Sequence, residues 1–296
     1  MNVAIVGAPV DLGADRRGVD MGASAIRYAG LESALQAAGH TVRDFGNVMV
    51  PVAESTETGP ADLKYLEPIC GMANSLADCV GQVIDEGWFP LILGGDHSMT
   101  LGSVAGVTRH RRVGVIWLDA HGDFNVPSTS PSGNIHGMVL SALAGYGDER
   151  LVHIDDRAPK IEAGNVALIG TRDLDPGERA LLLSSGVHVF TMHEIDRRGL
   201  SSVVELAVDR TGSGVDGIYL SLDLDVVDPS QAPGVGTPVL GGLSYRETHL
   251  AMEILAESGL LVAMDVVEVN PVLDTHNETA RLAMAFTLSA LGKRIF

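Results

Sequence analysis

The chain has 296 residues, and its 38 acidic and 20 basic side chains give a formal net charge of −18. Such an acidic surface repels nucleic acids and anionic membranes and attracts small cations, so we expect neither nucleic acid nor membrane as a partner. No stretch approaches the roughly 18 apolar residues of a membrane helix, the N-terminus does not resemble a signal peptide, and there are only two cysteines. These features together predict a cytoplasmic protein.

Short apolar runs alternate with helical patterns along the whole chain. Strands are predicted at residues 2–7, 41–45, 90–93, 113–118, 166–170, 187–190, 217–222 and 261–267. Helices are predicted at residues 23–38, 61–87, 98–108, 176–185, 200–210, 244–258 and 277–291. The strands are rich in Val, Ile and Leu without alternation, which indicates burial on both faces. This order predicts an α/β fold with a mostly parallel sheet and helices on both of its faces.

Three segments read as long loops, namely 51–60, 125–134 and 228–242, because they are dense in Pro, Gly, Ser or Thr. No internal repeat and no shift in composition marks a domain boundary. We therefore expect residues 1–296 to form a single domain whose long loops carry function.

Three of the predicted strands run directly into residues that can bind metal ions. Strand 90–93 is followed by GGDHS, strand 113–118 by DAHGD, and strand 217–222 by DLD. Ligands of open parallel sheets bind beyond the carboxyl ends of the strands, so we expect these three segments to meet in one site. Each segment alone could also be a helix cap or a turn.

The candidate metal ligands are two histidines and four aspartates: His97, His121, Asp119, Asp123, Asp223 and Asp225. Oxygen and imidazole ligands without thiolate suit Mn²⁺ or a similar ion better than structural zinc. Six side chains are too many for one catalytic ion that keeps open positions, so two ions sharing carboxylates are expected. Four carboxylates would balance two divalent cations, and a bridging hydroxide would then favour a cationic substrate.

The segments GGDHS, DAHGDFN, SGNIHG, SLDLDVVDP, APGVGTPVLGG and EVNP occur in the order in which they occur in the ureohydrolase family. The chain resembles this family, which includes arginases and agmatinases, over nearly its whole length, and it resembles the arginases most. The resemblance implies a three-layer α/β fold and a homotrimer or homohexamer. It also implies hydrolysis of L-arginine to L-ornithine and urea, by attack of a metal-bridging hydroxide on the guanidinium carbon.

The resemblance further implies two Mn²⁺ ions per subunit. One would be held by His97, Asp119, Asp123 and Asp223, and the other by Asp119, His121, Asp223 and Asp225. Asp123 also counts among the expected catalytic residues, because it helps to hold the first ion.

Other site residues follow from the same resemblance. His136 would be the proton shuttle to the leaving amine. The alternative is that this loop histidine only forms a hydrogen bond with the backbone. Glu268, at the end of an apolar run, would pair with the substrate guanidinium. The remaining expected substrate contacts are Asn125, Ser130 and Ser132 at the carboxylate, Asp175 and Glu178 at the ammonium, and Thr237. Asp175 and Glu178 also read as the start of a helix.

Two positions depart from the family pattern, Gly122 and Val139, and both bear on local loop geometry. Alternative functions are agmatinase or another guanidino-acid ureohydrolase and, more distantly, a binuclear phosphoesterase or a non-catalytic metal-binding protein. A phosphoesterase is disfavoured because no Lys/Arg cluster or phosphate-binding glycine loop accompanies the acidic motifs. A non-catalytic protein would lack a ligand or the shuttle, and neither is missing.

Overall fold

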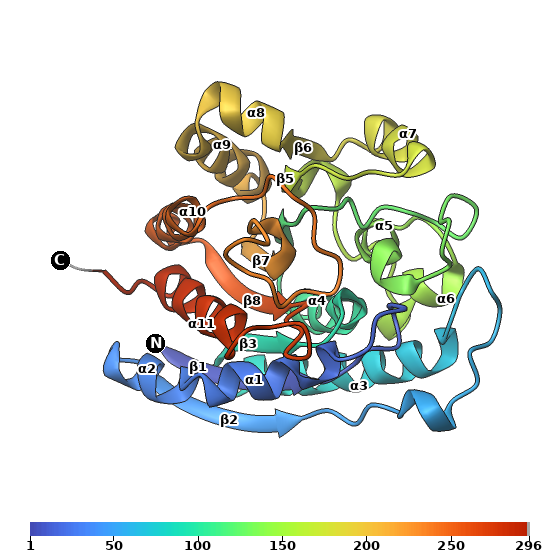
Figure 1. Ribbon diagram of the computed structural model, residues 1–296, viewed down its shortest axis with the longest axis horizontal. Coiled ribbons are helices and arrows are strands. Elements are labelled where there is room, and N and C mark those ends of the chain that lie inside the picture. The colour runs from blue at the N-terminus through green and yellow to red at the C-terminus, as the bar shows by residue number, and fades with distance from the viewer. Residues whose placement is uncertain (295–296) are drawn as a thin grey trace.

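Eight parallel strands form one sheet through the centre of the computed structural model, which describes residues 1–294 (Figure 1). Their bounds are β1 Asn2–Ala8, β2 Thr41–Asn47, β3 Phe89–Gly94, β4 Val113–Leu118, β5 Val166–Thr171, β6 His188–Thr191, β7 Gly217–Asp223 and β8 Leu261–Val267. The order across the sheet is β2-β1-β3-β8-β7-β4-β5-β6. All eight predicted strands are confirmed, and every pair of neighbouring strands is parallel.

Helices cover both faces of the sheet, as predicted (Figure 1). One apolar layer packs α3 Leu66–Asp85, α4 Thr100–Thr108, α5 Val139–Leu143, α6 Glu149–Val152 and α7 Pro176–Ser185. The other packs α1 Gly22–Tyr28, α2 Leu31–Ala37, α8 Met192–Arg198, α9 Leu200–Gly212, α10 Tyr245–Ser258 and α11 Glu278–Ala290. Alternate residues of one strand feed the two layers: Ala4 and Val6 face the first, whereas Val3 and Ile5 face the second.

Several helix boundaries differ from the prediction. The predicted helix 23–38 is two helices, because Gly30 between them adopts a left-handed backbone with φ 91°. The predicted helix 61–87 begins only at Leu66, after Tyr65 with φ 55°. The helices α5, α6 and α8 were not predicted, since segments of four to seven residues are too short to show a helical period.

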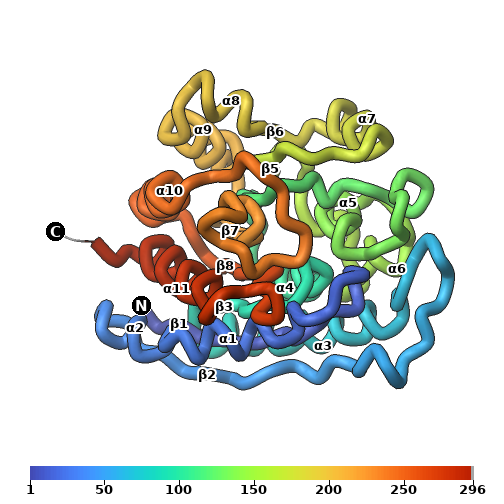
Figure 2. The backbone as a smooth tube through the Cα atoms, in the orientation of Figure 1, coloured from blue at the N-terminus to red at the C-terminus, as the bar shows by residue number. Residues whose placement is uncertain are grey.

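The two edge strands, β2 and β6, are exceptions to the burial expected for the strands, because no residue of β2 is buried and only Phe190 is buried in β6. The charged side chains Arg43 and Asp44 of β2 oppose the pairing of this edge with a strand of another chain. Figure 2 follows the long connection from β7 to α10, drawn in orange, which contains the predicted loop 228–242. Within residues 1–294, no helix has the length and apolarity needed to cross a membrane.

Candidate active site

The predicted metal ligands lie at the carboxyl ends of the central strands β3, β7 and β4, and Glu268 follows β8, which lies between β3 and β7. The backbone at this edge is unusual, since Asp123 and Glu268 both have positive φ, 48° and 63°. Gly95 lies so close to Val10 that an added Cβ would be 1.7 Å from the Val10 carbonyl oxygen. Strained and crowded backbone of this kind is held in place by its surroundings and is common at functional sites.

The six predicted ligands come together as two overlapping groups. His97 Nδ1 lies 3.3 Å from Asp119 Oδ2, 3.0 Å from Asp123 Oδ2 and 3.2 Å from Asp223 Oδ2. His121 Nδ1 lies 3.4 Å from Asp119 Oδ1 and 3.0 Å from Asp225 Oδ2. Ligand atoms of His97, Asp119 and Asp223, and those of Asp119, His121 and Asp225, are close enough together to hold one ion each. Asp119 belongs to both groups, whereas Asp223, which the resemblance implies for both ions, belongs only to the first.

The chemistry of this cluster fits divalent metal ions. His97 Nδ1 is a buried atom without a hydrogen-bond partner, although it faces three carboxylates. Burial raises the pKa of Asp123 and of Asp223, and neighbouring carboxylates raise both further. Buried like charges are costly unless a cation neutralises them. A metal ion between the carboxylates and the imidazole nitrogen would remove both costs.

Hydrogen bonds fix the orientation of the carboxylates. Backbone amides donate to them: His121 N to Asp119 Oδ1 at 2.7 Å, Ala120 N to Asp225 Oδ1 at 3.0 Å, and Asp225 N to Asp223 Oδ1 at 2.7 Å. The indole of Trp117 donates to Asp119 Oδ2 at 3.0 Å and stacks on the ring of His97, with centroids 4.1 Å apart. Trp117 is a site residue that sequence reasoning missed, because it stands inside a strand that reads as core.

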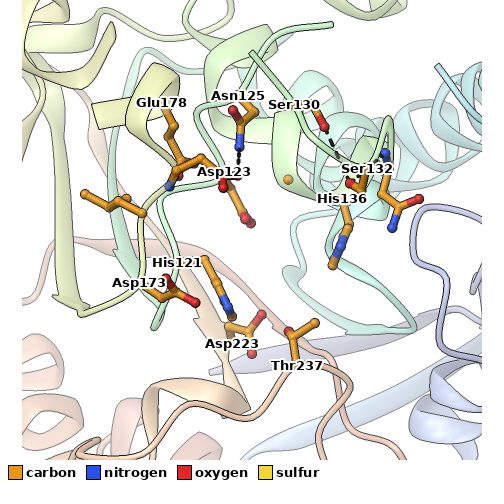
Figure 3. A pocket seen from close by; sticks show the side chains of 14 residues that line it. His121, Asp123, Asn125, Ser130, Ser132, His136, Asp173, Glu178, Asp223 and Thr237 are labelled. Atoms are coloured by element: carbon orange, nitrogen blue, oxygen red, sulfur yellow. Dashed lines mark hydrogen bonds between the residues drawn. The ribbon is translucent and has the colours of Figure 1, made fainter. Parts of the chain in front are cut away.

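A cavity of about 140 Å³ opens onto the cluster (Figure 3). Ten of the predicted site residues line it: His121, Asp123, Asn125, Ser130, Ser132, His136, Asp175, Glu178, Asp223 and Thr237. The other four predicted residues, His97, Asp119, Asp225 and Glu268, are almost fully buried and are not part of its wall. The wall also contains Asn134, Gly137, Asp173 and Leu174, which were not predicted although they stand in or beside the recognised motifs.

His136 and Glu268 form a pair beside the cluster, with Nδ1 and Oε1 3.1 Å apart. Burial opposes the charged form of His136, but Glu268 outweighs it and raises the pKa of the imidazole to about 9. Glu268 Oε1 also accepts a hydrogen bond from the backbone amide of His97 at 3.0 Å. Within residues 1–294 the second oxygen, Oε2, is buried without a hydrogen-bond partner.

Another part of the cavity wall is polar, and some of its side chains form hydrogen bonds within the protein. Asn125 donates to Asp175 Oδ2 at 3.0 Å, and Asp175 with Glu178 forms the capping box of α7, as the helix-start interpretation predicted. Glu178 is buried, which raises its pKa to about 7. A Cβ at Gly122 would lie 2.6 Å from Glu178 Oε1, so the glycine found here leaves room for that carboxylate.

Comparisons with known proteins show similarity over the whole chain. The chain is 52% identical to the arginase of Brevibacillus brevis over 296 residues, which cover 99% of each protein. Its fold matches the crystal structure of Bacillus subtilis arginase with a TM-score of 0.94 at 48% identity, covering 100% of both chains. It matches the native arginase structure of Bacillus caldovelox with a TM-score of 0.97 at 48% identity, covering 100% of this chain and 99% of that one. Residues 1–292 match the model of the arginase family, and the chain therefore belongs to that family.

Proposed function

We propose that this protein is an arginase, which hydrolyses L-arginine to L-ornithine and urea with two Mn²⁺ ions per subunit. The observation that carries the proposal is that two imidazoles and four carboxylates converge beside one cavity, with His97 Nδ1 directed at three of the carboxylates and lacking a hydrogen-bond partner within residues 1–294. Membership of a metal-dependent family whose similar members are named arginases supports the same reading.

In this proposal His97, Asp119, Asp123 and Asp223 would hold the first ion, and Asp119, His121, Asp223 and Asp225 would hold the second. Such a pair of ions, when bound, lowers the pKa of a coordinated water and so supplies a nucleophile at neutral pH. Asp123 is both a ligand and part of the cavity wall, so it adjoins the reacting atoms.

The protein's own residues orient the substrate and manage the proton. The free Oε2 of Glu268 accepts a hydrogen bond from the guanidinium and holds its carbon over the cluster. As water oxygen bonds to that carbon and the bond to the side-chain nitrogen breaks, the leaving amine needs a proton. His136 can provide it, because Glu268 favours the charged imidazole.

The amino-acid end of the substrate would lie along the polar wall of the cavity. In this proposal Asn125, Ser130 and Ser132 bond the α-carboxylate, and Asp175 and Glu178 bond the α-ammonium; the support is that all five line the cavity. Thr237 donates to Asp225 Oδ2 at 3.1 Å and is both a wall residue and a support for a ligand. This wall favours L-arginine over agmatine, which has no carboxylate. Among residues 1–294 no Lys or Arg lines the cavity, which disfavours a phosphoesterase.

We further propose that the chain acts as one ureohydrolase domain in the cytoplasm and assembles as a homotrimer or homohexamer. The resemblance to the family implies subunit contacts at Tyr245, Arg246 and Glu247, at the start of α10, and Tyr245 is 43% exposed. Sedimentation of the purified protein tests the stoichiometry.

The decisive experiment measures urea release from L-arginine, agmatine and 4-guanidinobutanoate by protein stripped of metal and then reloaded with Mn²⁺. We expect no activity without metal and fastest turnover of L-arginine after reloading. Faster turnover of agmatine would overturn the choice of substrate. Absence of urea from all three compounds, together with activity on a phosphate ester, would overturn the reaction.

A further inference from the structure

A buried carboxylate that the proposed mechanism does not use lies in the middle of the sheet. Asp265, in β8, is completely buried, and no ion pair involves it within residues 1–294. Its oxygens accept short hydrogen bonds from three hydroxyls, Thr100 Oγ1 at 2.6 Å, Tyr219 OH at 2.6 Å and Ser221 Oγ at 2.7 Å, and a long one from Ser103 Oγ at 3.5 Å. Bonds this short from hydroxyl donors are typical of an ionised acceptor. Burying a charge is costly, so we ask what Asp265 does among these donors.

One of these donors connects Asp265 to the metal cluster. Ser221 Oγ also lies 2.7 Å from His97 Nε2. A serine hydroxyl has one proton, and an ionised carboxylate can only accept, so Ser221 gives its proton to Asp265. His97 Nε2 must then carry the hydrogen that Ser221 accepts. The lone pair of the neutral ring is left on Nδ1, the atom that faces Asp119, Asp123 and Asp223.

We propose that Asp265 is a positioning residue that acts through Ser221 to hold His97 in the tautomer and orientation that bind the first metal ion. Partners of this kind fix the ring of a metal-binding histidine and increase its basicity. Trp117 stacks on one face of the His97 ring, and the bond between Ser221 Oγ and Nε2 holds the opposite edge of the ring from Nδ1. The inference rests on the proposed two-ion function.

The effect is specific to one ion. The ligand atoms of His121 lie near Asp119 and Asp225, and no hydrogen bond in the described part of the chain joins His121 to Asp265 or Ser221. Loss of Asp265 should therefore weaken the ion at His97 much more than the ion at His121. A general loss of packing would weaken both.

The test compares Mn²⁺ binding by the wild-type protein, Asp265→Asn, Ser221→Ala and the double variant, using calorimetry and electron paramagnetic resonance of the bound manganese. We expect each variant to bind one of the two ions at least about tenfold more weakly, the usual range for such partners. The spectrum should change from that of a coupled pair to that of an isolated ion. The double variant should lose no more affinity than either single variant, because both break the same connection.

Tyr219→Phe is the matched control, since it removes another hydrogen bond to Asp265 and leaves Ser221 in place. It should retain both ions, even if its metal-free unfolding temperature falls. If Asp265→Asn does not fold, Ser221→Ala with Tyr219→Phe carries the test. Wild-type affinity in Ser221→Ala, or equal loss of both ions in all variants, would overturn the inference. A wild-type protein that binds no ion pair would instead overturn the proposed function.

Discussion

Replacement of Glu268 by glutamine isolates the charge that the proposed mechanism places opposite the substrate guanidinium. In the structure Oε1 accepts from the backbone amide of His97 and pairs with His136, whereas Oε2 is buried and has no partner. A glutamine that keeps its oxygen toward His97 N must place its amide at the Oε2 position. That amide is a donor and would face the donors of the guanidinium.

The size of the effect follows from the number of charged bonds that are lost. One hydrogen bond to a charged group contributes roughly 1.5–3 kcal/mol, and only Oε2 is free to make it. Taking about 2–3 kcal/mol, and about 1.36 kcal/mol per tenfold, kcat/KM for L-arginine should fall about 30- to 160-fold. Part of the loss should appear in kcat, because the neutral residue no longer stabilises charged His136.

The assay is steady-state urea release, with bound manganese measured in the same preparations so that loss of metal is not mistaken for loss of orientation. Glu257→Gln, at an exposed glutamate of α10, is the matched control and should behave like the wild type. A Glu268→Gln enzyme with full metal content and kcat/KM within threefold of the wild type would refute this role for Glu268.

Three further predictions concern the cavity, the backbone and a loop. Ser132→Ala should raise KM for L-arginine several-fold and leave turnover of agmatine unchanged. If the serine only supports its loop, the variant should instead affect both substrates equally. Gly95→Ala should destabilise the metal-free protein by at least about 3 kcal/mol in thermal unfolding, because its Cβ meets the rigid carbonyl of Val10. The hydrogen bond from Ser230 Oγ lowers the pKa of Asp228 to about 2. The ionised Asp228 therefore stabilises the folded protein fully above the unfolded-state pKa of about 3.9, and this stabilisation is lost as the pH falls toward 2. Asp228→Asn should therefore lower the unfolding temperature at pH 7 and do so less at pH 3; an equal difference at both would contradict the assignment.

Much of the fold could be predicted from local patterns. The apolar runs that form β3, β4 and β7 are each six or seven residues long and buried along almost their whole length, so their composition alone identified them. The break at Gly30 and the short helix α8 could not be predicted in the same way. A single glycine does not reveal whether the chain will turn there, and seven residues are too few to establish a helical period.

The candidate site shows the same division. His97, Asp119 and Asp223 were predictable because each follows a strand, and parallel strands bring such positions to one edge of the sheet. Trp117, Ser221 and Asp265 were not, because each stands inside a strand and reads as core. Their role depends on the neighbours that the sheet order and register place beside them.

The amino-acid sequence by itself determined the elements, the ligand types and the end of the sheet at which they gather, since these depend on residues close together in the chain. Only the tertiary structure decided that Glu268 keeps one oxygen free and that Asp265 reaches His97 through Ser221. Those contacts join residues 124 and more positions apart, or lie between neighbouring strands whose pairing no local pattern specifies.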